Sequence, residues 1–217
     1  RGARLGTSSL RRQCQIAELP DPGMTIMQGN ITQPDSIGQA VEGVAAVIHL
    51  AALLPPASEQ ERDRTMAVNV EGTANVIAAL AGESPAAHLI LSSSVCVYGD
   101  TSDTTPPMRT SFPLRAVDLY AESKIAAERL VVEGPLDHTV LRISGISVPA
   151  FLAPPQVWPF QADQRLEFVC RDDVVTALAA CVGSTGAVGK VLNVAGGPTW
   201  RMLGREYVTR FNEVMGL

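Results

Sequence analysis

The sequence predicts an α/β protein in which a doubly wound, mostly parallel sheet carries a small C-terminal lobe. Short apolar runs alternate along the chain with segments of helical apolar spacing, and proline-rich stretches lie between them. Such alternation indicates βαβ units with helices on both faces of the sheet. The length of 217 residues suits one domain with a lobe, and we place the boundary between residues 1–145 and 146–217.

The strands are predicted from short apolar runs that turn-forming residues bound. Each run is short enough for a buried strand, and the helical segments between the runs make these strands neighbours in a parallel sheet. The expected strands are residues 24–27, 44–50, 87–92, 139–143 and 191–194.

The helices are predicted from apolar residues that recur every three or four positions. Residues 35–41 form the first crossover helix, and residues 65–81 form a longer helix that ends near Gly82. The remaining helices are residues 116–133 and 172–182. Three proline-rich loops lie at strand ends, where sheets of this type bind ligands: residues 53–57, 104–113 and 149–159.

Composition and charge exclude several classes of protein. A net charge of −5 without any basic run argues against a nucleic-acid partner. No apolar run reaches the roughly 18 to 20 residues of a membrane span, which argues against a membrane partner. The 4 cysteines form no C-x-x-C pair and have no metal-ligand spacing. They predict buried thiols, no metal site and a reducing, cytoplasmic setting.

Tyr120 and Lys124, in Y-A-E-S-K, are the most informative pair of residues in the chain. On a helix, positions i and i+4 share one face, so the phenol and the ammonium group can point into the same cleft. A tyrosine has a reference pKa near 10 and is a poor base at neutral pH. A fixed lysine charge beside it favours the phenolate, so we expect Lys124 to lower the pKa of Tyr120.

A serine cluster, Ser92 to Ser94, ends the strand that precedes this helix. A serine hydroxyl delivered from a strand end can hydrogen-bond the substrate oxygen that gains or loses the proton. Ser94 is the expected catalytic hydroxyl, whereas Ser92 is expected to be a strand residue that bonds through its backbone.

Together with other segments, these residues resemble the extended short-chain dehydrogenases/reductases, in the NAD-dependent epimerase/dehydratase branch. The resemblance runs from about Met24 to the C-terminus and keeps the family's order. The motifs are V-I-H-L-A-A from Val47, N-V-E-G-T-A-N-V from Asn69, S-S-S-V-C-V-Y-G from Ser92, Y-A-E-S-K from Tyr120, L-R-I-S-G from Leu141, F-V-C-R-D-D-V from Phe168 and L-N-V-A-G-G from Leu192. Chance produces single motifs of this size, but not the ordered set.

The resemblance implies a Rossmann-like core, residues 1–145, that binds NAD or NADP, with a substrate lobe, residues 146–217, interleaved with it. It implies that Tyr120 is the acid/base and that Ser94 steadies the developing oxyanion. Lys124 would bond the nicotinamide ribose and tune Tyr120. The implied cofactor contacts are Asn30, Ile31, Ala51, Ala52, Asn69, Tyr120 and Lys124.

Several of these positions have a plainer interpretation. Asn30 stands where the family usually has an aspartate that contacts the adenine amino group, yet asparagine also suits a turn. Ala51 and Ala52 either allow close approach to the cofactor or simply pack. Asn69 either orients the lysine through a water molecule or bonds within its own helix. His49 is expected to be a satisfied core residue.

Two departures from the family narrow the implied chemistry. Val95 and Cys96 stand where sugar 4,6-dehydratases carry an Asp-Glu pair, which disfavours dehydration. Gly145 replaces an asparagine of many nucleotide-sugar enzymes, which weakens the case for a UDP-sugar. Reversible hydride transfer remains, in an epimerase or a dehydrogenase/reductase acting on a small alcohol/ketone or sugar-type substrate. The resemblance also implies that Tyr98 lines the substrate pocket and that a homodimer forms through residues 65–81 and 116–133.

The family's first strand and its G-x-x-G-x-x-G turn do not occur in the sequence. Residues 1–5 resemble the tail of the second strand, so we expect a fragment that lacks about one βα unit. This leaves open an alternative: a catalytically inactive Rossmann-like binding or scaffold protein without the cofactor phosphate site. Residues 6–15, G-T-S-S-L-R-R-Q-C-Q, also resemble a segment of hydroxymethylbilane synthase, but no cysteine here has that family's setting.

Overall fold

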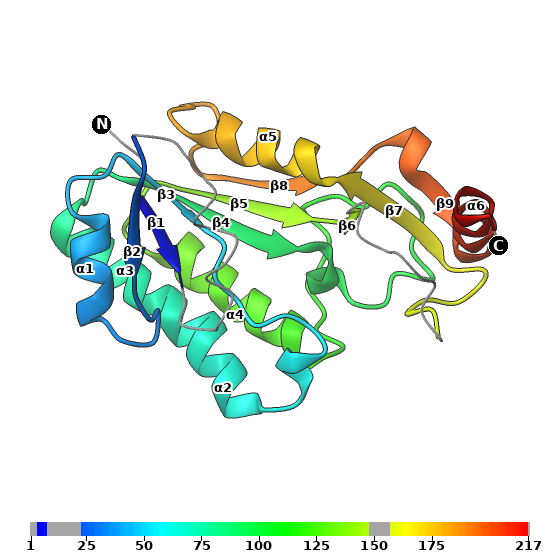
Figure 1. The fold of residues 1–217 in the computed structure, drawn as a ribbon, viewed down its shortest axis with the longest axis horizontal. Coiled ribbons are helices and arrows are strands. Elements are labelled where there is room, and N and C mark those ends of the chain that lie inside the picture. The colour runs from blue at the N-terminus through cyan, green and yellow to red at the C-terminus, as the bar shows by residue number, and fades with distance from the viewer. Residues whose placement is uncertain (1–3, 8–22, 148–156, 217) are drawn as a thin grey trace.

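The computed structural model describes residues 4–7, 23–147 and 157–216, and it confirms the predicted α/β class (Figure 1). A four-stranded parallel sheet has the order β3-β4-β5-β8. Its strands are β3 (Ala46–His49), β4 (His88–Ser94), β5 (His138–Ile143) and β8 (Lys190–Val194). At the N-terminal side, β1 (Arg4–Thr7) and β2 (Thr25–Gln28) form a separate parallel pair.

Helices cover both faces of the four-stranded sheet, as the alternation of elements predicts. In Figure 1, α1 (Asp35–Val41), α3 (Gly72–Glu83) and α4 (Leu119–Glu133) lie on one face, and α5 (Arg171–Cys181) lies on the other. Successive side chains of a strand point to opposite faces, so β4 supplies both cores. One core contains Leu80, Leu89, Leu91, Val131 and Val140, and the other contains Ile90, Leu141, Val174 and Leu178.

Two predicted helices differ at their ends from the structure. The helix expected at 65–81 extends from Arg62 to Glu83, as α2 (Arg62–Met66), a π-helical turn (Ala67–Glu71) and α3. The helix expected at 116–133 begins at Leu119, because Asp118 is its N-cap and accepts a hydrogen bond from the Ala121 amide at 2.7 Å. None of the described helices is both long and apolar enough to cross a membrane.

The C-terminal lobe has a small sheet of its own, in the order β6-β7-β9. It consists of β6 (Gly145–Ser147), β7 (Arg165–Cys170) and β9 (Arg201–Leu203), followed by α6 (Gly204–Met215). None of these elements is predicted as a strand or helix from the sequence, because they are short or polar on one side. The aromatic rings of Trp158, Phe160, Phe168, Tyr207 and Phe211 pack between them.

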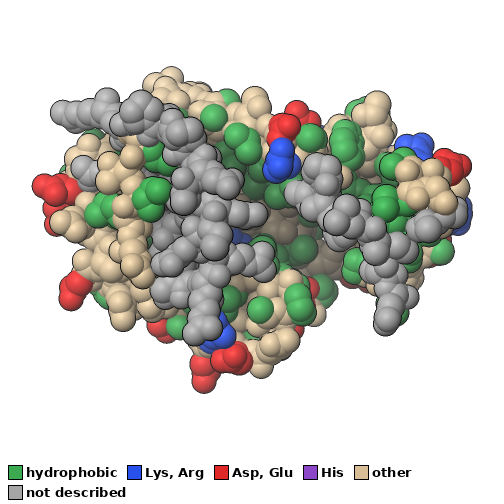
Figure 2. All heavy atoms as spheres, viewed as in Figure 1, with side chains coloured by type: hydrophobic (Ala, Val, Ile, Leu, Met, Phe, Trp, Pro, Cys, Tyr) green, Lys and Arg blue, Asp and Glu red, His purple; other side chains and the backbone are tan. Residues whose placement is uncertain are grey.

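The chain passes from the core to the lobe and back again. After β6 and β7 of the lobe, α5 packs on the main sheet and β8 forms its last strand. The face shown in Figure 2 is hollowed between the sheet core and the lobe, and hydrophobic side chains are visible in the depression. A division into a cofactor domain and a substrate lobe stays a prediction.

Candidate active site

Tyr120 lies in the first turn of α4 and is 8% exposed. The helix that carries it is rich in strong helix formers, and Asp118 closes its N-terminus. The Ser94 hydroxyl, at the carboxyl end of β4, interacts with the phenol. Tyr120 therefore faces the end of β4, the edge at which parallel sheets bind their ligands.

Lys124 follows one turn later and shares this face of α4. Its Nζ lies 5.9 Å from the centroid of the Tyr120 ring and donates a hydrogen bond of 2.8 Å to the backbone carbonyl of Ser92. The side chain is 5% exposed, and burial lowers the pKa of Lys124 to about 8, although the charge of Glu128 raises it. The i, i+4 spacing thus places both side chains beside the same strand, as predicted.

The structure contradicts the expected direction of the Tyr120 pKa. Burial, and to a smaller extent the electrostatic interaction with Cys96, raise the pKa of Tyr120 to about 12, against a smaller lowering effect of the Ser94 hydroxyl. Lys124 does not reverse this shift, because its own charged form is disfavoured by burial and its ammonium group is held on the Ser92 carbonyl. At neutral pH the phenol keeps its proton.

The structure separates the three serines of β4 by what each one contacts. The Ser92 carbonyl accepts the bond from Lys124, the Ser93 hydroxyl donates to Glu128, and only Ser94 interacts with the phenol of Tyr120 among these three. Ser94 also accepts a hydrogen bond of 3.2 Å from the Cys96 amide. The period of two along a strand explains why Ser93 points away from its neighbours.

Tyr98, which the resemblance places in the substrate pocket, is buried in the structure, at 3% exposure. Its hydroxyl donates to Oδ1 of Asn193 at 2.6 Å and accepts a bond of 3.0 Å from Arg142. Arg142 in turn forms a buried ion pair with Glu128 at 2.7 Å. Tyr98 therefore joins the loop after β4 to β5, β8 and α4, and a substrate contact stays a prediction.

Asn69 fixes the loop that follows β3. Its Oδ1 accepts from the Leu53 amide at 2.7 Å, and its Nδ2 donates to the Leu53 carbonyl at 3.1 Å and to the Ser123 hydroxyl at 2.8 Å. Ala51 and Ala52 lie immediately before this anchor, at the carboxyl end of β3. Asn69 belongs to the π-helical turn, a feature that often marks functional sites. Its side chain holds this loop, and the cofactor contacts of Asn69, Ala51 and Ala52 stay predictions.

His49 is a satisfied core residue, as predicted. Its Nε2 lies 3.0 Å from the Thr73 hydroxyl, and burial lowers the pKa of His49 to about 4, with a further lowering from Lys124. Thr73 gives its only proton to the Asn69 carbonyl at 2.7 Å, so His49 donates through Nε2.

Asn30 forms a turn of its own at the carboxyl end of β2. Its Oδ1 accepts bonds from the amide and the hydroxyl of Thr32, at 3.1 and 2.9 Å. A carbonyl oxygen has two lone pairs, so an adenine contact through this oxygen requires the release of one of these bonds. The carbonyl of Ile31 accepts from Asn75 at 3.0 Å. The adenine role of Asn30 and the contact from Ile31 stay predictions.

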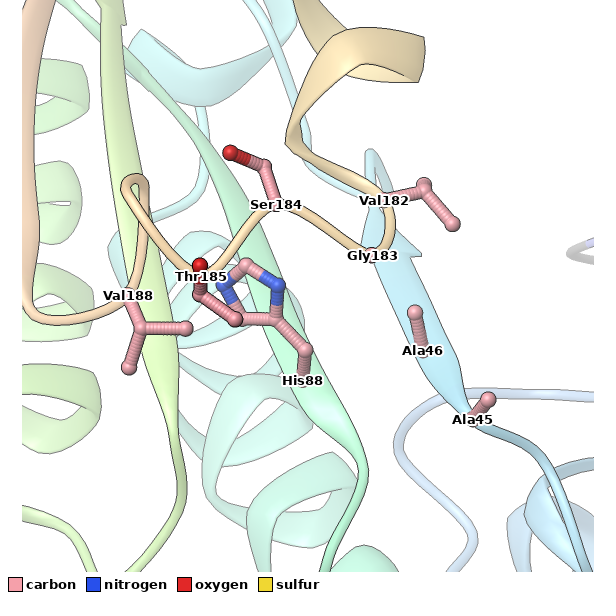
Figure 3. A pocket seen from close by; sticks show the side chains of 8 residues that line it. All are labelled: Ala45, Ala46, His88, Val182, Gly183, Ser184, Thr185 and Val188. Carbon is pink, nitrogen blue, oxygen red and sulfur yellow. The ribbon is translucent and has the colours of Figure 1, made fainter.

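Two hollows lie at opposite ends of the parallel strands. A polar hollow of about 310 Å³ is lined by Gln28, Gly29, Asn30, Gln33 and Ser36, at the carboxyl end of β2. The other, of about 220 Å³, lies at the amino ends of β3 and β4 (Figure 3). Its lining is mostly apolar, and its one imidazole, His88, is bonded to Thr139 at 2.8 Å. Ligand chemistry is therefore expected at the first end.

Three residues at this site are not predicted from the sequence. Glu59 caps the backbone of Tyr120, and Glu128 reaches Ser93 and Arg142 one turn beyond Lys124. The i+4 spacing after Lys124 is a signal that could have identified Glu128. Ser144, directly after β5, has a buried hydroxyl without a partner among the described side chains.

The described residues at this edge of the sheet provide polar groups that can bond a dinucleotide. The polar hollow at β2 provides amide and hydroxyl groups, and the unpaired Ser144 hydroxyl lies beside the strand position that pairs with Ser94. Among the described residues, no group of three or more His, Cys, Asp or Glu side chains is arranged to hold a metal ion. Residues 8–22, which include most of the segment resembling hydroxymethylbilane synthase, lie outside the described part of the chain.

Comparison with known proteins agrees with this geometry. The chain matches the model of the NAD dependent epimerase/dehydratase family over residues 4–145. It belongs to this family. The match confirms the resemblance carried by the motifs, and the family is NAD-dependent by description.

Among curated relatives, the 3-beta-hydroxysteroid dehydrogenase of Mycolicibacterium neoaurum is 32% identical over 150 residues, 60% of this chain and 39% of that protein. The chain thus spans well under half the length of this relative. The fold resembles RMD of Pseudomonas aeruginosa, complexed with NADPH, with a TM-score of 0.77 and 22% identity over 99% of this chain and 84% of that one. It also resembles WbmG of Bordetella bronchiseptica, in complex with NAD, with a TM-score of 0.81 and 19% identity over 100% and 71% of the two chains.

Proposed function

We propose that the protein is an NAD(P)-dependent oxidoreductase or epimerase that acts by hydride transfer at a secondary alcohol or ketone. The observation that carries this proposal is the convergence of Tyr120, Lys124 and Ser94 at the carboxyl end of β4. Membership of an NAD-dependent family supports the cofactor. The matched relative described as a dehydrogenase, and the neighbours with NAD and NADPH, support the reaction class.

In the proposed mechanism, Tyr120 handles the proton. Its pKa, raised to about 12, keeps the phenol protonated at neutral pH, so Tyr120 can donate a proton to a substrate carbonyl oxygen. Ser94 hydrogen-bonds the same oxygen and steadies its developing negative charge. A bound nicotinamide cofactor supplies or accepts the hydride.

Lys124 stabilises the phenolate that remains after the proton has left. With a pKa of about 8 it is mostly protonated at neutral pH, and its ammonium group stays beside Tyr120 through the bond to Ser92. The favourable interaction arises only once Tyr120 carries a charge, which is the state that the reaction must reach. We also assign Lys124 the predicted contact with the nicotinamide ribose.

The substrate that we propose is a small secondary alcohol or ketone, either steroid-like or sugar-type, handled in a cytoplasmic setting. The decisive experiment is a panel of 3β-hydroxysteroids and nucleotide sugars, with NAD⁺ and NADP⁺, followed by the absorbance of the reduced nicotinamide. Turnover that Tyr120→Phe abolishes supports the proposal. A protein that binds a dinucleotide but turns over no member of the panel, or that binds none, favours the inactive scaffold.

We further propose a homodimer through α2–α3 and α4. Both helices carry alanines that allow close approach, and Val132 of α4 is 46% exposed although it is apolar. Sedimentation should give twice the chain mass at micromolar concentration. A monomer that persists there, or a dimer unaffected by Val132→Glu, would contradict this interface.

A further inference from the structure

The carboxylate of Glu59 closes the first turn of α4. Its Oε2 accepts a hydrogen bond of 3.0 Å from the Leu119 amide, and its Oε1 accepts one of 3.0 Å from the Tyr120 amide. The first amides of a helix have no partner within the helix, so they need such an acceptor. A negative charge at this end also interacts favourably with the helix dipole.

Glu59 projects from the well-anchored loop between β3 and α2. It ends the 3₁₀ helix Ala57–Glu59, and the neighbouring Ser58 is fully buried. The Ser58 hydroxyl donates a hydrogen bond of 2.7 Å to Glu59 Oε1. The backbone carbonyl of Ser58 accepts a hydrogen bond of 2.8 Å from the Thr65 hydroxyl. The same loop is also held at Leu53, which Asn69 anchors through two hydrogen bonds. Glu59 is exposed to solvent, but these hydrogen bonds hold its carboxylate in place as an acceptor for the start of α4.

We propose that Glu59 is a positioning residue for Tyr120, which ties the backbone of the acid/base to the loop after β3. The inference rests on the proposed catalytic role of Tyr120. Because Glu59 holds the Tyr120 amide itself, it limits movement of the phenol relative to Ser94, on the separate strand β4. Displacement of a reacting group by about 1 Å can cost a large factor in rate.

A second link between these elements does not replace Glu59. Arg62, at the start of α2, forms an ion pair with Glu122 of α4, and both side chains are largely exposed. This pair joins the ends of two long side chains, whereas Glu59 reaches the backbone of Leu119 and Tyr120. The ion pair is bidentate, with Arg62 Nη1 donating to Glu122 Oε2 at 3.0 Å and Nη2 donating to Oε1, but it holds α4 through a side chain and leaves the Tyr120 amide to Glu59.

The test compares Glu59→Ala and Glu59→Gln with wild type in amide hydrogen exchange and in steady-state kinetics with the substrate that the panel described above identifies. In Glu59→Ala, exchange of the Leu119 and Tyr120 amides should accelerate by about tenfold or more, while amides from Lys124 onward stay protected. The kcat should fall by roughly tenfold to a hundredfold, with KM changed by less than about twofold. Glu59→Gln keeps one acceptor oxygen and should recover part of both effects.

The matched control is Glu61→Gln, because Glu61 is an exposed carboxylate on the same loop that pairs with Arg64 instead of α4. This variant should match wild type in both measurements. Unchanged exchange at Leu119 and Tyr120 in Glu59→Ala would overturn the proposal, as would faster exchange with an unchanged kcat. If wild type turns over nothing, the proposed function fails, and the exchange comparison still decides whether Glu59 holds Tyr120.

Discussion

The two halves of α4 carry ionisable side chains that are buried to a similar extent but are satisfied very differently. In the second half, Glu128 accepts hydrogen bonds from both Ser93 and Arg142, at the centre of a network that continues to Tyr98. In the first half, Lys124 makes one hydrogen bond to a backbone carbonyl in the described part of the chain, and burial alters the pKa of both Lys124 and Tyr120.

This difference distinguishes the buried ion pair of α4 from the two residues of the same helix that we propose as catalytic. A buried ion pair with a complete set of hydrogen-bond partners rigidifies the fold. A buried group with few partners has a shifted pKa and can change its protonation state during a reaction. The next four predictions test this distinction, from the largest expected effect to the smallest.

Tyr120→Phe should abolish nearly all turnover and leave the fold intact. The phenol is the proposed proton donor, and loss of such a group typically costs about a hundredfold or more in rate. Steady-state kinetics and a thermal melt measure the two outcomes. Tyr207→Phe, in the aromatic cluster of the lobe, is the matched control and should keep its activity. Retention of more than about a tenth of the wild-type kcat would remove Tyr120 from the catalytic role.

Glu128→Gln should destabilise the fold by about 3 kcal/mol or more, because it leaves Arg142 charged, buried and without its anionic partner. Urea denaturation measures the loss. Glu133→Gln, at the exposed end of α4, should change stability by less than about 0.5 kcal/mol. A Glu128→Met, Arg142→Met double variant should recover much of the stability. If Glu128→Gln alone lost little stability, the hydrogen bonds of Glu128 in the second half of α4 would matter no more than those of Lys124 in the first half.

Lys124→Met should remove activity but stabilise the fold at pH 7 by up to roughly 3 kcal/mol, since burial lowers the lysine pKa from 10.5 to about 8. The unfolded chain binds more protons than the folded one between these two values, so wild-type stability should rise with pH across this window. The difference in the free energy of unfolding between wild type and Lys124→Met should therefore shrink between pH 8 and 10.5. Urea denaturation at several pH values checks this, and a destabilised Lys124→Met would contradict it.

The three serines of β4 give the smallest and most selective effects. Ser93→Ala should cost about 1–2 kcal/mol, because it removes a hydrogen bond to a charged carboxylate. Ser94→Ala should lower kcat and leave stability nearly unchanged. Ser92→Ala should change neither stability nor kcat, since Ser92 contacts Lys124 through its backbone carbonyl. Equal effects of all three substitutions would show that the strand does not separate these roles.

Much of the core and of the site is predictable because local patterns determine it. The apolar runs place β4, β5 and β8 to within a few residues, and the predicted helix 35–41 coincides with α1. The i, i+4 spacing predicts that Tyr120 and Lys124 share a face, because helix geometry alone fixes that relation. The ordered motifs also predict the family that the comparison confirms.

Only the tertiary structure decides what those side chains meet and how they are charged. The opposite direction of the Tyr120 pKa, the interior position of Tyr98 and the contact from Glu59 all depend on groups far apart in sequence that packing brings together. Desolvation is set by the whole surroundings of a group, and no spacing along one helix encodes it. The sequence by itself thus determined the fold class and the principal side chains, and packing decided which of them are held in place and which can change their charge.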